Sequence, residues 1–438
     1  MKLTVFQADK GDCLLLESRD SKRRILIDGG MRESYRRFVA PALGELARGG
    51  HALDLVYVSH VDQDHIAGVL QLFDDHAAWK IHEFQRSRGN TAHKPPASPR
   101  PPAVKEVWHN AFGEQVGDDA PAIRDALAAT AAIAGGSSIP EVVEAASRNA
   151  DLASSIPEAI RLSRRLSKEQ LGIPLNQRFG NRLAFVRVDE KPRTIRLDPL
   201  RIAVIGPFES ELEELREEWR VWLAKNRAAL EKIRRAGVED SESMGRNDAR
   251  SLIELQLAQA ALLGDRDAVT TPNLASLMLL VREGTKSLLL TGDGHSEDIL
   301  KGLAFQKALD RSGRIHVDVL KFQHHGSEHN TDREFFSRVS ADHYIFCGNG
   351  EHANPDLRVV ESLLDSRLEA VAHRATHPRA GRPFRLWFNT SESATERRPA
   401  KEHVREVRRL VESRAARSPG RFEASFLEGA SPSFEIEI

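Results

Sequence analysis

The sequence has very few cysteines, no long apolar run and almost no net charge. Cys13 and Cys347 are the only cysteines, which excludes a framework of disulfide bonds. No apolar run approaches the length that crosses a bilayer, and residues 1–9 turn polar too early for a signal peptide. The net charge of -1 gives no overall attraction to nucleic acid or to a membrane surface. These absences predict a soluble, cytoplasmic protein with no membrane partner.

What the sequence does have is enough apolar material for a large core. The chain has 438 residues, of which 40% are hydrophobic, and this size suits two or three domains or one large domain with insertions. We divide it into an N-terminal framework half (1–85), a largely helical insertion with some framework strands (86–265), a second framework half (266–365) and C-terminal strands with a basic helix packed on the core (366–438).

Apolar runs and helix-like stretches alternate along the framework, which predicts an α/β fold. Strands are expected at 2–7, 13–17, 24–27, 53–58, 183–188, 200–205, 277–282, 287–290, 316–322, 343–347, 384–388 and 422–426, and helices at 35–47, 67–73, in several pieces of 120–172, and at 209–236, 249–263 and 397–421.

The most informative segment follows the apolar run 53–58. His60, Asp62, Asp64 and His65 fall within six residues, where a strand ends and a helix is expected to begin. Such a turn can direct all four side chains into one small volume. Imidazole nitrogens and carboxylate oxygens are suitable ligands for Zn²⁺ or Mn²⁺. The alternative is a polar loop with local side-chain-to-backbone hydrogen bonds.

Polar clusters also follow several other expected strands. In open α/β sheets, ligands collect at the carboxyl ends of the strands. Each cluster alone has a simple structural explanation, but their repetition predicts one shared site. The clusters are Asp28-Gly29-Gly30, His60 to His65, Thr291-Gly292-Asp293, His324-His325-Gly326-Ser327 and Asn349 to His352.

These motifs, in this order, resemble those of the metallo-β-lactamase-fold hydrolases, and most closely those of the ComEC-like branch. In that branch an Asp replaces the second His of the usual His-x-His-x-Asp-His motif, as Asp62 does here. The resemblance covers about residues 1–85 and 270–365, and it implies a four-layer αββα sandwich with a large, mostly helical insertion. The other matching segments are Gly11-Asp12-Cys13, Ile27 to Gly30, Asn273-x-x-Ser276, Leu290 to Asp293, Leu320 to Ser327 and His352 to Pro355.

The resemblance also implies the role of each site residue. One metal ion would be bound by His60 and Asp62, the second by Asp64 and His65, with Asp293 bridging the two and His352 closing one site; Asp28, Asn273 and Ser276 would support these ligands. The usual third-motif His is missing, because Asn273 to Ser276 occupy its place. We therefore expect two divalent ions, Zn²⁺ or Mn²⁺, in a site richer in oxygen than usual.

Two such ions about 3.5–4 Å apart can activate a water for in-line attack on phosphorus. Asp64 is predicted to accept or steer the water proton. Either His324 or His325 would stabilise the developing charge or protonate the leaving group, and the sequence leaves open which one faces the metals.

The preferred substrate is nucleic acid or a nucleotide. The basic segment 397–421 carries nine Lys or Arg against three Glu, and such a helix could follow phosphates, although a solvated helix surface explains it equally well. The same ambiguity holds for a smaller basic patch, Arg161, Arg164, Arg165 and Lys168.

Two other functions stay open. The site could hydrolyse a lactone, thioester or β-lactam beneath a lid formed by the insertion. The chain could instead be a module regulated by a protein partner. The set of converging His and Asp side chains favours an enzyme over a non-catalytic module.

Overall fold

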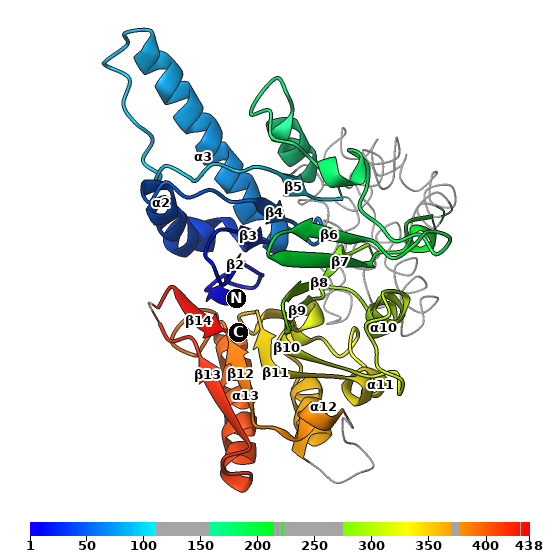
Figure 1. The fold of residues 1–438 in the computed structure, drawn as a ribbon. Coiled ribbons are helices and arrows are strands. Elements are labelled where there is room, and N and C mark those ends of the chain that lie inside the picture. The colour runs from blue at the N-terminus through cyan, green and yellow to red at the C-terminus, as the bar shows by residue number, and fades with distance from the viewer. Residues whose placement is uncertain (111–157, 214–216, 218–220, 222–274, 369–376, 430) are drawn as a thin grey trace, which may run out of the picture.

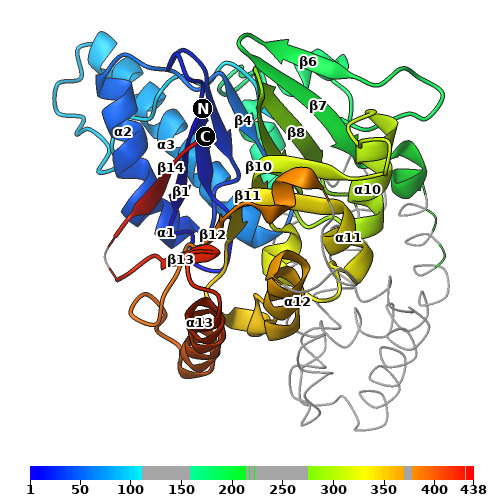
Figure 2. The ribbon, with the colours of Figure 1, turned by 60° about the horizontal axis from the view of Figure 1, so that its bottom comes forward.

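Two β-sheets packed face to face form the centre of the molecule, with helices on both outer sides (Figure 1). The computed structural model describes residues 1–110, 158–213, 217, 221, 275–368, 377–429 and 431–438. In Figure 2, α2 and α3 lie on one outer side of the sheets, and α10 and α11 lie on the other. The layers therefore run helix, sheet, sheet, helix.

The first sheet has six strands in the order β14-β1-β2-β3-β4-β5. Its first part is antiparallel, while β3, β4 and β5 run parallel. Chain segments from the two ends of the sequence meet in it, because β14 pairs with β1. The strands are β1 (Lys2–Phe6), β2 (Leu14–Glu17), β3 (Arg24–Ile27), β4 (Leu55–Tyr57), β5 (Val107–Trp108) and β14 (Ser433–Glu437).

The second sheet has eight strands in the order β13-β12-β11-β10-β9-β8-β7-β6. From β6 to β9 the neighbours are antiparallel, and from β9 to β13 they are parallel. The strands are β6 (Thr194–Leu197), β7 (Leu200–Gly206), β8 (Met278–Glu283), β9 (Lys286–Leu290), β10 (Ile315–Lys321), β11 (Val339–Phe346), β12 (Phe384–Phe388) and β13 (Phe422–Phe426).

Helices cover the outer face of each sheet. On the first sheet these are α1 (Arg32–Ser34), a π-helical stretch η1 (Tyr35–Val39), α2 (Ala40–Arg48) and α3 (Gln63–Ser87); on the second they are α10 (Ser296–Phe305), α11 (Arg333–Arg338), α12 (Leu357–Leu368) and α13 (Arg398–Arg417). Short 3-10 turns are η3 (Gln177–Phe179), η5 (Gln323–Gly326), η6 (Glu351–Ala353) and η7 (Pro378–Gly381).

Three apolar cores follow from the alternation of side chains along the strands. In β4, Leu55 and Tyr57 point into the core between the sheets, while Val56 points into the core beneath α2 and α3. A third core joins the second sheet to the helices that follow it. Strands buried on both faces read as continuous apolar runs, as these do. The four-layer αββα sandwich predicted from the sequence is confirmed.

The structure corrects several element boundaries. α3 begins at Gln63 and runs to Ser87, so it is much longer than the predicted helix 67–73. The predicted strand 183–188 is only a bridge between Val186 and Phe208. The strands β5, β6 and β14 were not predicted, because strands this short or this polar lack a clear apolar pattern.

The predicted insertion lies mostly outside the described residues. This holds for most of 120–172, for most of 209–236 and for all of 249–263. Within the described part of 86–265, residues 158–166 are helical, and β5, β6 and β7 belong to the sheets. No helix in the described parts of the chain is long and apolar enough to cross a membrane.

Candidate metal site

The site lies where strands of both sheets end at one edge of the sandwich. β3 ends before Asp28 and β4 before Ser59 and His60, and because these strands are parallel their ends meet. The backbone N–H of Ser59 donates to Asp28 Oδ1 (2.7 Å), and its hydroxyl donates to Asp28 Oδ2 (2.8 Å). The N–H of Leu277 donates to Ser59 O (2.7 Å), which ties this loop to the second sheet.

A close approach between a loop and a helix fixes the first turn of α3. The N–H of Gly29 donates to His65 O and that of Gly68 to Gly30 O, both at 2.9 Å. A Cβ at Gly68 would lie 1.9 Å from Gly29 O, so only glycine fits there. Asp64 and His65 belong to this first turn. The helix therefore presents both side chains to the strand ends.

One buried group of ligand atoms consists of His60, His65 and Asp293. The Nε2 atoms of His60 and His65 each lie 3.5 Å from a different carboxylate oxygen of Asp293. Asp62 Oδ2 lies 3.7 Å from His60 Nε2, and Asp64 Oδ2 lies 3.7 Å from His65 Nε2. Asp293 thus stands between a His60–Asp62 pair and a His65–Asp64 pair, as a bridging ligand would.

The two histidines of η5 take different positions. His325 Nε2 lies 3.0 Å from Asp64 Oδ2 and 3.7 Å from Asp293 Oδ2. His324 Nε2 also approaches Asp293 Oδ2, at 3.8 Å, while its Nδ1 lies 2.6 Å from Asn330 Oδ1. Both residues have positive φ, 43° and 56°, which is unfavourable for residues with a Cβ and is common at functional sites. His325 joins the Asp64 side of the site, and His324 lies toward its more exposed side.

Two further carboxylates contact the second ring nitrogens of His65 and His325. His65 Nδ1 lies 3.0 Å from Asp28 Oδ2, and His325 Nδ1 lies 3.3 Å from Asp12 Oδ1. Lys321, only 2% exposed, contacts Asp12 and lies 3.8 Å from Asp293 Oδ1. Metal-binding histidines usually donate their second ring N–H to such a partner, which fixes the ring and its tautomer.

The concentration of carboxylates shifts the pKa values of their neighbours. Burial alone would lower the pKa of His65, but Asp293, Asp64, Asp12 and Asp28 outweigh it and raise that pKa well above its usual value. The pKa of His325 is raised to about 9 against burial, mainly by Asp293. Burial would raise the pKa of Asp12, but Lys321 lowers it to about 2. The site therefore attracts positive charge.

Unsatisfied polar atoms show that the site suits metal ions. His60 Nε2, His65 Nε2, Asp62 Oδ1 and Asp293 Oδ1 are buried and lack hydrogen-bond partners within the described parts of the chain. Leaving such atoms unpaired is costly. Nitrogen and carboxylate donors that converge in this way fit divalent ions.

The remaining predicted residues are the ligand candidate His352 and the supporting residues Asn273 and Ser276. His352 lies exposed on η6, with a positive φ of 56°. Asn273 lies outside the described residues. Ser276 is buried and supports the site indirectly, because its Oγ accepts a hydrogen bond from the N–H of Asp293 (3.2 Å).

The sequence prediction missed four residues of the site. Asp12 and Lys321 lie in segments that carried the family resemblance, so their motifs were available as a signal. Asn330, which positions His324, had no signal. His109 follows the two-residue strand β5, is fully buried, and has neither ring nitrogen hydrogen-bonded to the described residues. Burial and the nearby His60 lower the pKa of His109 to about 3.

Comparison with known proteins agrees with this geometry. Residues 7–122 match the family model of the metallo-beta-lactamase superfamily. No curated protein matches the chain. The matched segment contains Asp28 and the His60–His65 segment, while Asp293 and His325 come from the second half of the sandwich. The chain therefore carries a metallo-β-lactamase superfamily domain, which implies a metal-dependent hydrolase.

Proposed function

We propose that this metal-dependent hydrolase is a phosphodiesterase that acts on nucleic acid or a nucleotide with two divalent ions, Zn²⁺ or Mn²⁺. The observation that carries the proposal is Asp62, a carboxylate whose Oδ2 lies 3.7 Å from His60 Nε2. It makes the donor set around His60 richer in oxygen. Oxygen-rich sites favour harder ions such as Mn²⁺, which also bind phosphoryl oxygens well.

The ions would lower the pKa of a water and neutralise charge on a phosphoryl oxygen. Asp64 is the chain's own group for receiving the water proton. Its carboxylate is fully ionised near neutral pH: burial would raise its pKa, but His65 and His325 outweigh this and lower it. His325 Nε2, at 3.0 Å from Asp64 Oδ2, holds that oxygen in place. An ionised carboxylate at this position can act as a general base.

His324 is the better placed of the two histidines to protonate the leaving oxygen. Its Nδ1 is held by Asn330 Oδ1 at 2.6 Å, so its Nε2 is directed toward the Asp293 side of the site. Its side chain is 24% exposed, whereas that of His325 is 7% exposed. Burial lowers the pKa of His324, which makes its protonated form a stronger acid.

The test compares the parent protein with Asp64→Ala. Hydrolysis of bis(p-nitrophenyl) phosphate, single-stranded DNA and RNA is measured with Mn²⁺ or Zn²⁺, together with the metal content of each protein. Parallel assays with a β-lactam, a lactone and a thioester cover the small-molecule alternative. We expect the parent to cleave phosphodiesters and Asp64→Ala to lose roughly a hundredfold or more of this rate, as removal of a general base does.

Exposed Asp332, the N-cap of α11, provides the control substitution Asp332→Asn, which leaves the site unchanged. Equal rates of phosphodiester hydrolysis in the parent and in Asp64→Ala would show that the hydrolysis does not take place at this site. Turnover of a lactone or β-lactam without turnover of any phosphodiester would favour the small-molecule hydrolase.

A further inference from the structure

The basic segments noticed in the sequence have their charges largely compensated in the folded protein. On α13, Arg398 pairs with Glu402 and Arg405 with Glu392, both at 2.9 Å, and Arg408 contacts Glu428. In the smaller patch, Arg161 and Arg165 share Asp74 as a partner. These arginines are therefore poor candidates for binding phosphates.

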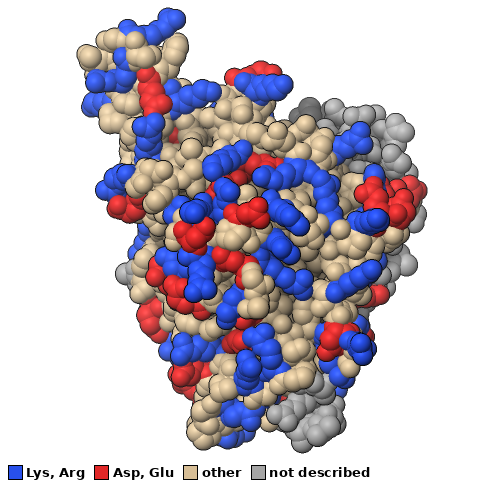
Figure 3. Space-filling model, viewed as in Figure 1, with Lys and Arg blue, Asp and Glu red and all other residues tan. Residues whose placement is uncertain are grey.

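A different set of arginines comes together only through strand pairing. Arg196 of β6 pairs in register with Arg201 of β7, and Arg201 pairs with Arg282 of β8. All three side chains are exposed, and within the described part of the chain none of them forms an ion pair. We call these three residues the arginine row. Figure 3 shows many Lys and Arg side chains on this face, where β6 to β8 lie in Figure 1, with some Asp and Glu side chains among them.

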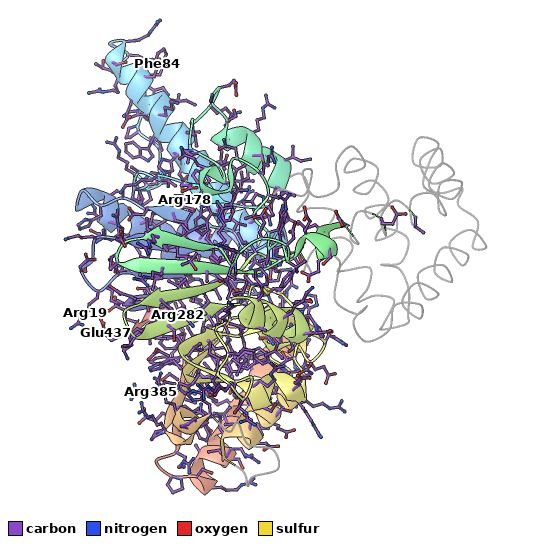
Figure 4. The ribbon with its side chains drawn as sticks, turned by 45° about the vertical axis from the view of Figure 1, so that its right-hand side comes forward. Arg19, Phe84, Arg178, Arg282, Arg385 and Glu437 are labelled. Atoms are coloured by element: carbon purple, nitrogen blue, oxygen red, sulfur yellow. The ribbon has the colours of Figure 1, made fainter. Side chains whose placement is uncertain are left out.

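The arginine row is unfavourable for the folded protein on its own. Neighbouring strands lie about 4.8 Å apart, and like charges directly opposite one another destabilise a sheet. By contrast, Arg385, which Figure 4 shows on the same side of the molecule as Arg282, has Glu423 as a partner at 2.7 Å. An anion with several charges spaced along a line would relieve the repulsion, and guanidinium groups bind phosphates with two parallel hydrogen bonds.

The distance between the arginine row and the metal site limits which anion could bind to both. Arg282 is paired with Ser287 near the start of β9, and Asp293 follows the other end of that strand. Six residues at about 3.3 Å each place the row on the order of 20 Å from the metal site. This separation corresponds to about six steps of a nucleic-acid strand at 3.4 Å per step in a duplex. A single nucleotide does not reach both places, whereas a polymer does.

We propose that the arginine row binds the sugar-phosphate backbone of a nucleic-acid strand whose cleavage occurs at the metal site. This inference rests on the proposed phosphodiesterase function and narrows its substrate class to a polymer. The row contacts phosphates and not bases, so it contributes affinity and orientation without sequence preference.

The test uses two triple variants with the same change of charge. One is Arg196→Gln, Arg201→Gln and Arg282→Gln; the control is Arg398→Gln, Arg405→Gln and Arg408→Gln on α13. Binding of a labelled 30-nucleotide DNA strand is measured at several salt concentrations, with Asp64→Ala added to each protein to prevent cleavage. Hydrolysis of the DNA and of bis(p-nitrophenyl) phosphate is measured without that addition.

For the row variant we expect about tenfold weaker DNA binding and a salt slope smaller by about 2, because three single-strand phosphate contacts are lost. DNA cleavage at low substrate concentration should fall in parallel, while hydrolysis of bis(p-nitrophenyl) phosphate and the circular dichroism spectrum stay unchanged. The control variant should bind like the parent.

Equal affinities and slopes for the row and control variants would overturn the inference. The inference would also be overturned if polyglutamate or anionic vesicles bound the parent as tightly as DNA does and the row variant lost that binding to the same extent. The arginine row would then serve another class of partner. Absence of phosphodiester hydrolysis in the parent would instead refute the proposed function, and the binding measurements would still decide the role of the row.

Discussion

At the scale of the residue, the site depends on histidines that use both ring nitrogens. His65 presents Nε2 to Asp293 and keeps Nδ1 against Asp28. His325 presents Nε2 to Asp64 and keeps Nδ1 against Asp12, whose own charge is balanced by the buried Lys321. Partners of this kind, one contact away from a metal, commonly affect its affinity 10–100-fold. The positions of the two histidine rings are therefore set by contacts at both of their ring nitrogens; Asp12, His65 and His325 themselves form a second group of converging ligand atoms.

The positions of His325 and His352 give a direct prediction. We expect His325→Ala to weaken binding of a divalent ion by at least about 10–100-fold, which is the effect of losing a residue that holds a metal ligand in place. The reason is that His325 Nε2 lies 3.0 Å from Asp64 Oδ2. His352→Ala should bind metal like the parent, because His352 is exposed outside the ligand group. Metal content and calorimetric titration with Zn²⁺ or Mn²⁺ check both; the reverse pattern would restore His352 as a ligand.

At the scale of the element, short turns after strands bring the chemistry together. α3 begins at Gln63 directly after the β4 loop, and its close contact with Gly29 through Gly68 fixes the position of the helical turn that carries Asp64 and His65. The 3-10 turn η5 does the same for His324 and His325 after β10. Rigid elements hold ligands more accurately than long loops do.

The segment after β7 contains a carboxyl group with an unusual pKa. Glu211 is buried, accepts a hydrogen bond from the N–H of Phe208 (2.8 Å) and pairs with Lys301 (3.0 Å). Burial first, and Asp298 second, raise the pKa of Glu211 to about 7. The folded protein therefore binds a proton that the unfolded chain releases near its ordinary value of 4.5.

This group should make the protein less stable as the pH rises. The stabilisation from protonated Glu211 is complete below pH about 4.5 and is lost as the pH rises through about 7, with an upper limit on the order of 3 kcal/mol. Glu211→Gln, which stays neutral, should flatten this part of the profile. Urea denaturation midpoints at several pH values between 4.5 and 7.5 provide the check, and parallel profiles for the two proteins would contradict it.

At the scale of the whole molecule, the two ends of the sequence pair with each other at one edge of the first sheet. β14 pairs with β1 over five residue pairs, and the N-terminal amino group of Met1 contacts the carbonyl of Ile438 at 3.3 Å. Figure 1 shows both termini side by side between the sheets. Ile436 is buried in the core between the sheets. The last strand thus covers an edge that would otherwise be open.

Removal of residues 431–438 should destabilise the protein and make it self-associate. Loss of the buried Ile436 side chain alone costs about 1.5–3 kcal/mol, and the uncovered β1 offers unpaired backbone groups to other chains. The outward-facing double substitution Glu435→Ala and Glu437→Ala should have little effect, since both side chains are exposed. Thermal denaturation and light scattering distinguish the two variants; a truncated protein as stable and monodisperse as the parent would show that β14 is dispensable.

The sequence by itself determined an α/β fold and the strand-end positions of Asp28, His60 to His65 and Asp293, because apolar periodicity and neighbours along the chain are displayed in a sequence. The αββα layers and the metal-dependent hydrolase were implied by the resemblance that the motifs at these positions carry. Only the tertiary structure decided that His325 lies against Asp64 while His352 is exposed, that Asp12 and Lys321 contact each other next to His325 and Asp293, that several arginines of α13 are paired with acids, and that Arg196, Arg201 and Arg282 form a row. Each of these depends on strand register or loop conformation between residues far apart in the sequence, where small differences in packing decide which side chains meet.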